Sequence, residues 1–158
     1  MRVPQSVAVV FAAAVALMAQ LVNATTAAVT RQDFHVKTDD GSGIFVRELR
    51  PATIASDREP LILVHGARVP GLGSFDLAVP GGSLAFDLAE QTGRTVYVMD
   101  VRGYGGSDRP PAMEQPASAN PPQARAFEVS RDIAAVVTDA QRRTHSRSVA
   151  LLGWATGG

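Results

Sequence analysis

Residues 148–158 read SVALLGWATGG, and this stretch decides how the rest of the sequence is interpreted. Its first half, through Leu152, is a continuous aliphatic run of the kind found in parallel strands that are covered on both faces. Its second half reads Gly-x-x-x-Gly-Gly, and the small residues Gly153 and Gly157 allow the backbone to turn sharply. The stretch therefore predicts a central strand that ends in a tight turn, with Ala155 at the tip.

Two more aliphatic runs lie upstream of this strand, at residues 61–64 and 95–99. Helical patterns separate the three runs. A short helix is predicted to begin after Ser83, whose hydroxyl suits an N-cap, and to end at Gly93. A longer helix is predicted over residues 124–143, where apolar residues recur at helical spacing on one face. Strands that alternate with helices in this way predict parallel β-α-β units.

The N-terminal part of the domain has a different pattern. Residues 33–38 and 44–49 alternate apolar and polar side chains around the turn sequence DDGSG, which predicts an antiparallel β-hairpin with one face buried. Residues 108–123 are rich in proline and predict a surface loop within the domain. The predicted fold class over residues 29–158 is α/β, with a mostly parallel sheet that begins with an antiparallel hairpin.

Three loops carry the residues of chemical interest, because ligands of open α/β sheets bind at the carboxyl ends of the parallel strands. His65-Gly66 follows the first strand, the sequence DVRGYGGS of residues 100–107 follows the second, and the turn around Ala155 follows the third. In this order the three motifs resemble those of the α/β-hydrolase fold family, in which the third is the nucleophile elbow. The resemblance covers nearly all of residues 29–158.

The resemblance implies roles for the residues at the elbow. The tip of the elbow is the family's acyl-accepting nucleophile, but here it is Ala155, whose methyl group cannot attack a carbonyl. The backbone amides of Ala67 and Thr156 occupy the positions that bind the oxyanion. The Thr156 hydroxyl lies one position past the tip and is expected to point away from the line of attack. Trp154 is expected either to line an acyl pocket or to pack against the fold.

The other motif residues are expected to shape the loops rather than to react. They are His65, Gly66, Asp100, Arg102, Gly103, Gly105, Gly153 and Gly157. His65 is interpreted as a structural histidine that holds its loop by hydrogen bonds. His35, in a hairpin strand, and His145, after a helix, do not lie on loops that would bring them to Ala155. No metal and no cofactor is expected.

The family orders its catalytic residues as nucleophile, acid and histidine. The sequence given extends to Gly158, so the resemblance implies that the acid and the histidine are missing from it. We therefore expect the chain to be the N-terminal portion of an α/β-hydrolase domain, truncated after the nucleophile elbow. One edge of its last strand should then be exposed.

The first 24 residues read as a secretory signal peptide. Arg2 provides a positive charge, residues 7–17 form an unbroken apolar run, and Ala24 completes a small-x-small cleavage site, with Ala28 as a second candidate. The apolar run is shorter than the roughly 20 residues that a membrane-spanning helix needs, although an uncleaved anchor stays open as an alternative. Either interpretation predicts export, to a periplasm or beyond.

The composition excludes several classes of function. The 158 residues contain 15 Lys and Arg against 15 Asp and Glu, so no nucleic-acid partner is expected, nor any membrane contact beyond the signal segment. The absence of cysteine excludes disulfides and thiolate catalysis. A small-molecule substrate or ligand is the expected partner.

Three functional hypotheses remain. In the first, the full-length protein acts on an ester, an amide or a similar carbonyl compound, while this chain alone is inactive. In the second, the protein is a pseudo-hydrolase that binds a small ligand without turnover. In the third, Gly153-x-Ala155-x-x-Gly158 is a dinucleotide-binding turn, although alanine replaces the glycine that lets the backbone approach a pyrophosphate and the turn follows the third strand instead of the first.

Overall fold

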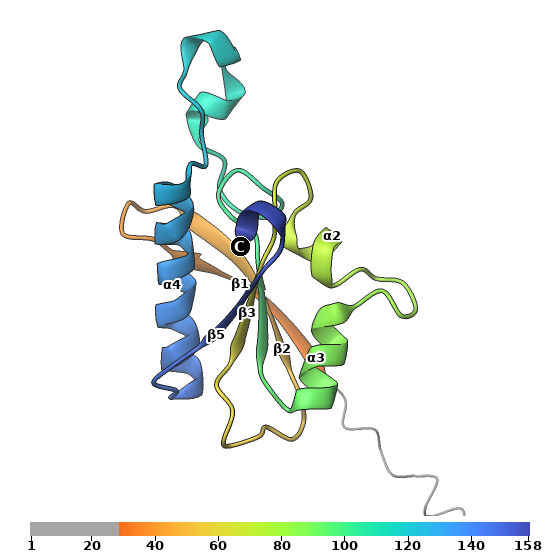
Figure 1. The fold of residues 1–158 in the computed structure, drawn as a ribbon. Helices are drawn as coiled ribbons and strands as arrows, with labels where there is room; N and C mark the ends of the chain where they lie inside the picture. The colour runs from red at the N-terminus through yellow and green to blue at the C-terminus, as the bar shows by residue number, and fades with distance from the viewer. Residues whose placement is uncertain (1–28) are drawn as a thin grey trace, which may run out of the picture.

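The computed structural model describes residues 29–158, which form a five-stranded mixed sheet with helices on both faces (Figure 1). The strands are β1 (Thr30–Lys37), β2 (Gly43–Arg50), β3 (Leu61–Val64), β4 (Val96–Met99) and β5 (Ala150–Gly153). Their order across the sheet is β1-β2-β4-β3-β5. β1 pairs antiparallel with β2 and β2 pairs antiparallel with β4, whereas β3 pairs parallel with both β4 and β5. The predicted α/β class with an antiparallel N-terminal hairpin is confirmed.

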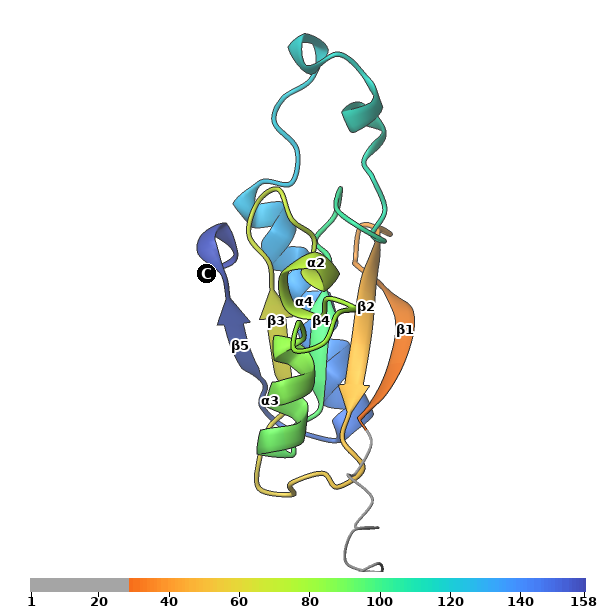
Figure 2. The ribbon, with the colours of Figure 1, turned by 90° about the vertical axis from the view of Figure 1, so that its right-hand side faces the viewer.

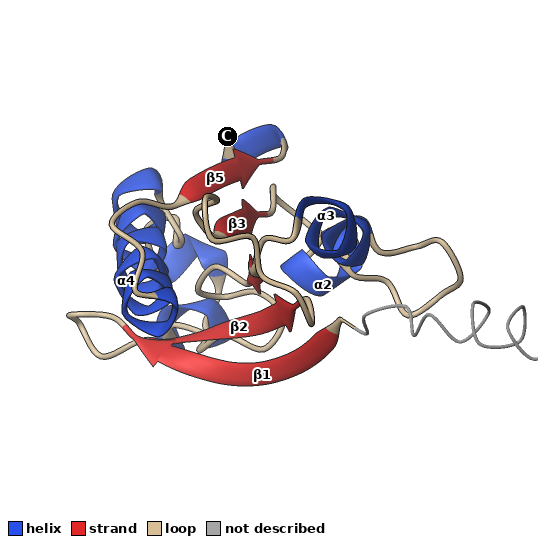
Figure 3. Cartoon of the chain, turned by 90° about the horizontal axis from the view of Figure 1, so that it is seen from below, coloured by secondary structure: helices blue, strands red, loops and turns tan. Residues whose placement is uncertain are grey.

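The helices lie in two layers. α2 (Gly71–Phe75) and α3 (Leu84–Thr92) cover one face of the sheet, and α4 (Ala126–Thr144) covers the other (Figures 2 and 3). The Ser83 hydroxyl accepts a hydrogen bond from the Phe86 amide at 2.9 Å, and Gly93 ends α3 in the left-handed conformation, so both predicted caps are confirmed. The long predicted helix is also confirmed, with α4 beginning two residues later than expected.

Two apolar cores lie on opposite sides of the sheet. On the α3 side, Leu63 and Val98 pack against Ala85 and Ala89. On the α4 side, the predicted apolar stripe of the helix packs onto the other face of the same strands. Its members are Val129, Ile133, Val136, Val137 and Ala140. Because side chains alternate between the faces of a strand, the continuous aliphatic sequences of β3 and β4 supply both cores.

The hairpin differs from its prediction. β1 is the outer strand and is largely exposed, while every residue of β2 except Arg50 is buried or partly buried. β2 contributes Ile44 to the core under α4 and Leu49 to the core under α3, so both of its faces are covered. The prediction of one buried face was therefore wrong for β2. Its position between β1 and β4 cannot be inferred from its own alternating sequence.

Three smaller features complete the described part of the chain. The predicted proline-rich loop carries two short 3-10 turns, η1 (Pro111–Glu114) and η2 (Ala117–Ala119), and extends beyond the carboxyl end of the parallel strands (Figure 1). A third 3-10 turn, η3 (Ala155–Gly157), follows β5. The helix α2 was not predicted.

The proposed signal segment, residues 1–24, lies outside the described residues. Among residues 29–158, no helix is long and apolar enough to cross a membrane.

Candidate active site

The three motif loops lie next to one another because their strands end at the same level of the sheet. Val64, the last residue of β3, pairs with Met99 at the end of β4 and with Gly153 at the end of β5. The parallel register therefore places the His65-Gly66 loop between the turn that follows β4 and the turn that follows β5. A site assembled from these three loops lies at the carboxyl edge of the sheet.

The turn after β5 is sharp and strained, and it forms the 3-10 turn η3. Ala155 lies at its tip with φ of 53°, in the left-handed region that alanine rarely adopts. The amide of Trp154 donates to the carbonyl of Val64 at 3.0 Å, which fixes the start of the turn against β3. Gly157 lies against the same strand, since a Cβ there would be 2.6 Å from the Val64 carbonyl oxygen. The elbow is therefore held against the end of β3 at both of its ends.

Gly66 brings the loop after β3 into direct contact with the elbow. A Cβ at this position would lie 2.8 Å from the carbonyl oxygen of Trp154 and 2.9 Å from Cβ of Ala155. The same Cβ would lie 3.4 Å from the amide nitrogen of Thr156. The absence of a side chain at residue 66 is therefore what allows the two loops to approach each other at the tip.

The two amides assigned to the oxyanion site are brought to this contact. The Ala67 amide lies on the loop after β3, and the Thr156 amide lies on the elbow. The Ala67 N–H donates a hydrogen bond to the hydroxyl oxygen of Thr156 at 2.8 Å. The Thr156 side chain thus reaches across to the opposite loop, a placement that the sequence did not indicate.

His65 is buried beneath the loops, with an exposed fraction of 3%. Its Nε2 accepts a hydrogen bond from the Val101 amide at 3.1 Å, and its Nδ1 lies 2.6 Å from the carbonyl oxygen of Gly66. An amide can only donate, so Nε2 carries no proton, and the proton on Nδ1 is donated to Gly66. The ring also packs edge-to-face against Tyr104, with the ring centroids 5.0 Å apart. His65 thereby joins the loops that follow β3 and β4.

The Asp100 carboxylate organises the turn after β4. It accepts hydrogen bonds from the Gly71 amide at 2.6 Å and from the Gly106 amide at 2.9 Å. The backbone carbonyl of Asp100 accepts a third hydrogen bond, from the Ser107 hydroxyl at 2.5 Å. A Cβ on Gly105 would collide with this carboxylate. Asp100 is therefore occupied by backbone donors on both sides.

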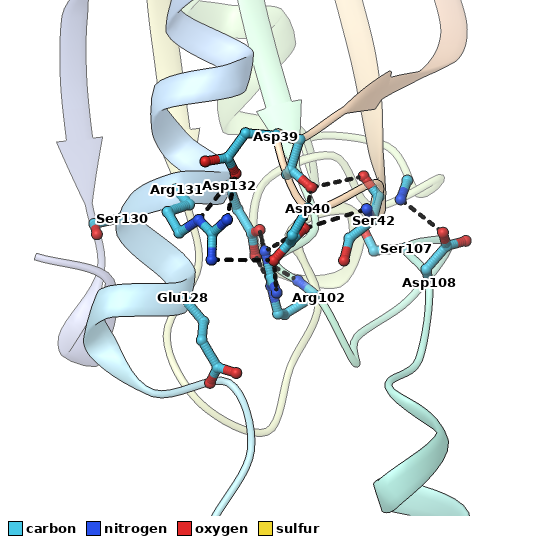
Figure 4. A network of polar contacts seen from close by, with 12 residues as sticks. Asp39, Asp40, Ser42, Arg102, Ser107, Asp108, Glu128, Ser130, Arg131 and Asp132 are labelled. Atoms are coloured by element: carbon cyan, nitrogen blue, oxygen red, sulfur yellow. Dashed lines mark hydrogen bonds and ion pairs between the residues drawn. The ribbon is translucent and has the colours of Figure 1, made fainter.

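Arg102 has different partners (Figure 4). Its guanidinium donates to the fully buried carboxylate of Asp132 on α4 at 2.7 Å and to Asp40 at 2.8 Å. The hydrogen bond from Arg102 holds the pKa of Asp40 far below its usual range, and the bond to Asp132 raises the pKa of Arg102. Arg131 adds a further ion pair to Asp40 at 3.4 Å. The network connects the hairpin turn, the loop after β4 and α4.

Gly103 lies in the same turn, with φ of 83°, and its amide donates to the carbonyl of Asp108 at 2.9 Å. Asp132 was not predicted from the sequence as part of the site. The available indication was its position as a charged residue on the apolar face of the long helix, because a charged side chain is seldom buried without an ionic partner.

A cavity of about 490 Å³ opens beside these loops. Its wall combines the loop after β3, the elbow, Tyr104 and the first turns of α4. Residues from all of these segments line the cavity, among them His65, Ala67, Tyr104, Val129, Ile133 and Thr156. The wall is mostly apolar and includes Thr156, an arrangement suited to a small molecule with one polar group.

Other candidate residues lie away from this cavity. Trp154 is 65% exposed, so it neither packs in the core nor lines the cavity. His35 Nε2 lies 2.9 Å from the carbonyl oxygen of Gly106, and His145 ends α4 in the left-handed conformation. Among residues 29–158, no group of three or more His, Asp or Glu side chains is arranged to hold a metal ion.

A strained turn at the end of a parallel strand, contacted at its tip by a His-Gly loop, is typical of α/β-hydrolase folds. Residues 59–158 match the family model described as alpha/beta hydrolase fold, and the chain belongs to this family.

Solved structures share this fold. An esterase from Pyrococcus furiosus is 14% identical with a TM-score of 0.59, and the match covers 82% of this chain and 42% of the esterase. The α/β hydrolase GrgF from a Penicillium species is 24% identical with a TM-score of 0.54, covering 82% and 39% of the two chains. A candidate aryl esterase from Burkholderia cenocepacia is 25% identical with a TM-score of 0.50, covering 80% and 38%.

The chain thus spans about two fifths of the length of each of these proteins. No curated protein matches it.

Proposed function

We propose that the full-length protein is an exported α/β-hydrolase-family protein whose site accepts an ester, an amide or a similar carbonyl compound. The observation that carries this proposal is the contact of Gly66 with Ala155 and Thr156 at the elbow tip. This contact places the Ala67 and Thr156 amides on neighbouring loops beside an apolar cavity. Two amides on neighbouring loops are suited to bind a carbonyl oxygen that gains negative charge.

The chain as it stands is not competent for covalent catalysis. Ala155 occupies the strained tip, and its methyl group has no lone pair with which to attack a carbonyl carbon. His65 is no substitute for a general base, because its Nε2 already accepts the Val101 amide and its Nδ1–H is committed to Gly66. The site supports binding and polarisation of a carbonyl group, without an acyl-enzyme.

The test is to restore the nucleophile. Ala155→Ser in the protein expressed from the complete reading frame should hydrolyse p-nitrophenyl acetate, while the alanine protein should stay at the background rate. A double variant, Ala155→Ser with Gly66→Val, is the control, because it keeps the hydroxyl and separates the loops. Equal rates for the alanine and serine proteins would count against a latent serine mechanism.

The second candidate function is ligand binding without turnover. Alanine at the tip, with the elbow geometry and both amides retained, favours this pseudo-hydrolase interpretation. A native full-length protein that binds a small ester with one-to-one stoichiometry and releases it unchanged would support it. The reading frame beyond Gly158 separates the two candidates, because an enzyme requires an acidic residue and then a loop histidine.

Export is part of the same proposal. The signal pattern of residues 1–24 predicts cleavage after Ala24, so the mature protein should begin at Thr25. N-terminal sequencing of protein recovered from the periplasm or medium tests this, and an intact Met1 on membrane-bound protein would indicate the anchor instead.

A further inference from the structure

The Ala67 amide is already occupied within the chain. Its N–H donates to the Thr156 hydroxyl oxygen at 2.8 Å, although the proposed function requires that N–H for a ligand oxygen. We infer that the Thr156 hydroxyl is an internal occupant of the oxyanion site and that it sets how tightly a ligand oxygen can bind there. This inference rests on the proposed function and adds a residue that determines affinity.

The position of the contact allows the hydroxyl to be displaced. Ala67 and Thr156 are both exposed, so the side chain of Thr156 can rotate to another staggered position without disturbing the core. The elbow backbone around Thr156 is fixed. The Trp154 amide donates a hydrogen bond to the Val64 carbonyl, and the Gly157 amide donates one to the Trp154 carbonyl. The hydroxyl is therefore the partner that moves, and the elbow backbone keeps its position when the hydroxyl leaves.

Competition follows from the number of hydrogen bonds that one N–H can make. A backbone amide has a single proton, so a ligand oxygen that takes it must displace the hydroxyl. A typical net hydrogen bond corresponds to a factor of about two to ten in an equilibrium constant. Removing the hydroxyl should therefore strengthen ligand binding by that factor.

The first measurement tests the internal hydrogen bond without any ligand. In the 15N-labelled full-length protein, the exchange of the Ala67 amide proton with water should be about two- to tenfold faster in Thr156→Ala than in the native protein. Thr156→Ser is the matched control, because it differs from the alanine variant by one oxygen atom and should exchange at the native rate. Equal exchange rates in all three proteins would overturn the inference.

The second measurement tests competition. Ethyl butyrate is titrated into each protein, and the chemical shift of the Ala67 amide reports the Kd. Thr156→Ala should bind about two- to tenfold more tightly than the native protein and the Thr156→Ser variant. Measurable but equal affinities would overturn this inference alone. No binding by any of the three proteins would instead overturn the proposed function on which the inference depends.

Discussion

The guanidinium of Arg102 lies 2.7 Å from the carboxylate of Asp132, and the two side chains are 6% and 0% exposed. Arg102 comes from the turn after β4 and Asp132 from the apolar side of α4. The pair therefore fixes the helix against the loops of the site. Asp40 of the hairpin turn shares the guanidinium at 2.8 Å, which extends the connection to the outer strands.

Removal of Arg102 alone should be far more harmful than removal of both members of this pair. Arg102→Met leaves the Asp132 carboxylate without a cationic partner in the core and should lower the free energy of unfolding by about 3–5 kcal/mol. Asp132→Leu should cost less, because Arg102 keeps its ion pair with Asp40. The double variant should also lose less than Arg102→Met, because no buried carboxylate is left without a partner. Urea unfolding monitored by circular dichroism measures each value.

A surface pair provides the control for this experiment. Arg109 and Glu114 are 2.8 Å apart, but their side chains are 54% and 68% exposed. Arg109→Gln should change the free energy of unfolding by less than about 1 kcal/mol. A comparable loss for Arg109→Gln and Arg102→Met would contradict the special role of burial.

The acid sensitivity of the fold should depend on Asp76. Burial raises the pKa of this carboxyl group, but hydrogen bonds from Arg31 and Ser83 together lower it by more than burial raises it. The folded-state pKa therefore lies below the ordinary 3.8. The folded protein then binds fewer protons than the unfolded chain. The stabilisation is complete above the ordinary pKa and is lost as the pH falls through the lower, folded-state value.

The expected result is a free energy of unfolding that declines with acid below about pH 4 in the native protein and declines less steeply in Asp76→Asn. Urea unfolding at a series of pH values between 6 and 2.5 gives the two slopes. The exposed residue Asp57 supplies the control, since Asp57→Asn should follow the native curve. Identical slopes for the native protein and Asp76→Asn would refute the assignment.

Gly66→Ala should separate the loop after β3 from the elbow. The added methyl group would lie 2.8 Å from the Trp154 carbonyl oxygen and 2.9 Å from Cβ of Ala155, so the backbone must shift. We expect a loss of about 1–3 kcal/mol in the free energy of unfolding, as for other overpacked sites, together with weaker ester binding. Gly158→Ala is the control, because the atom nearest to its added Cβ would be 3.5 Å away. An equal loss of stability in Gly158→Ala would disprove the steric explanation.

His65 should exist as the neutral tautomer with the proton on Nδ1. Nε2 accepts the Val101 amide, so it cannot carry a proton while that hydrogen bond exists. Nitrogen-15 correlation spectra of the imidazole ring distinguish the tautomers directly. A proton on Nε2 would contradict the structure. His65→Ala should lower the free energy of unfolding by about 1–3 kcal/mol, because the Val101 amide loses its hydrogen-bond partner.

Local sequence patterns predicted much of the fold. The aliphatic runs of β3 and β4 indicated strands covered on both faces, and Ser83 and Gly93 marked the ends of α3. These signals succeed because capping and periodicity depend on residues within a few positions of each other. The same reasoning failed for the hairpin, where the burial of β2 depends on strands and helices that are distant in the sequence.

The sequence by itself determined the elbow: the aliphatic strand, the flanking Gly153 and Gly157, and alanine where the family has a nucleophile. Only the tertiary structure decided that the Thr156 hydroxyl occupies the Ala67 amide and that Asp132 pairs with Arg102. The sequence specifies the chemical type of each side chain. Its partner is set when strands in parallel register and packed helices bring distant residues within hydrogen-bonding distance, and that geometry exists only in the folded chain.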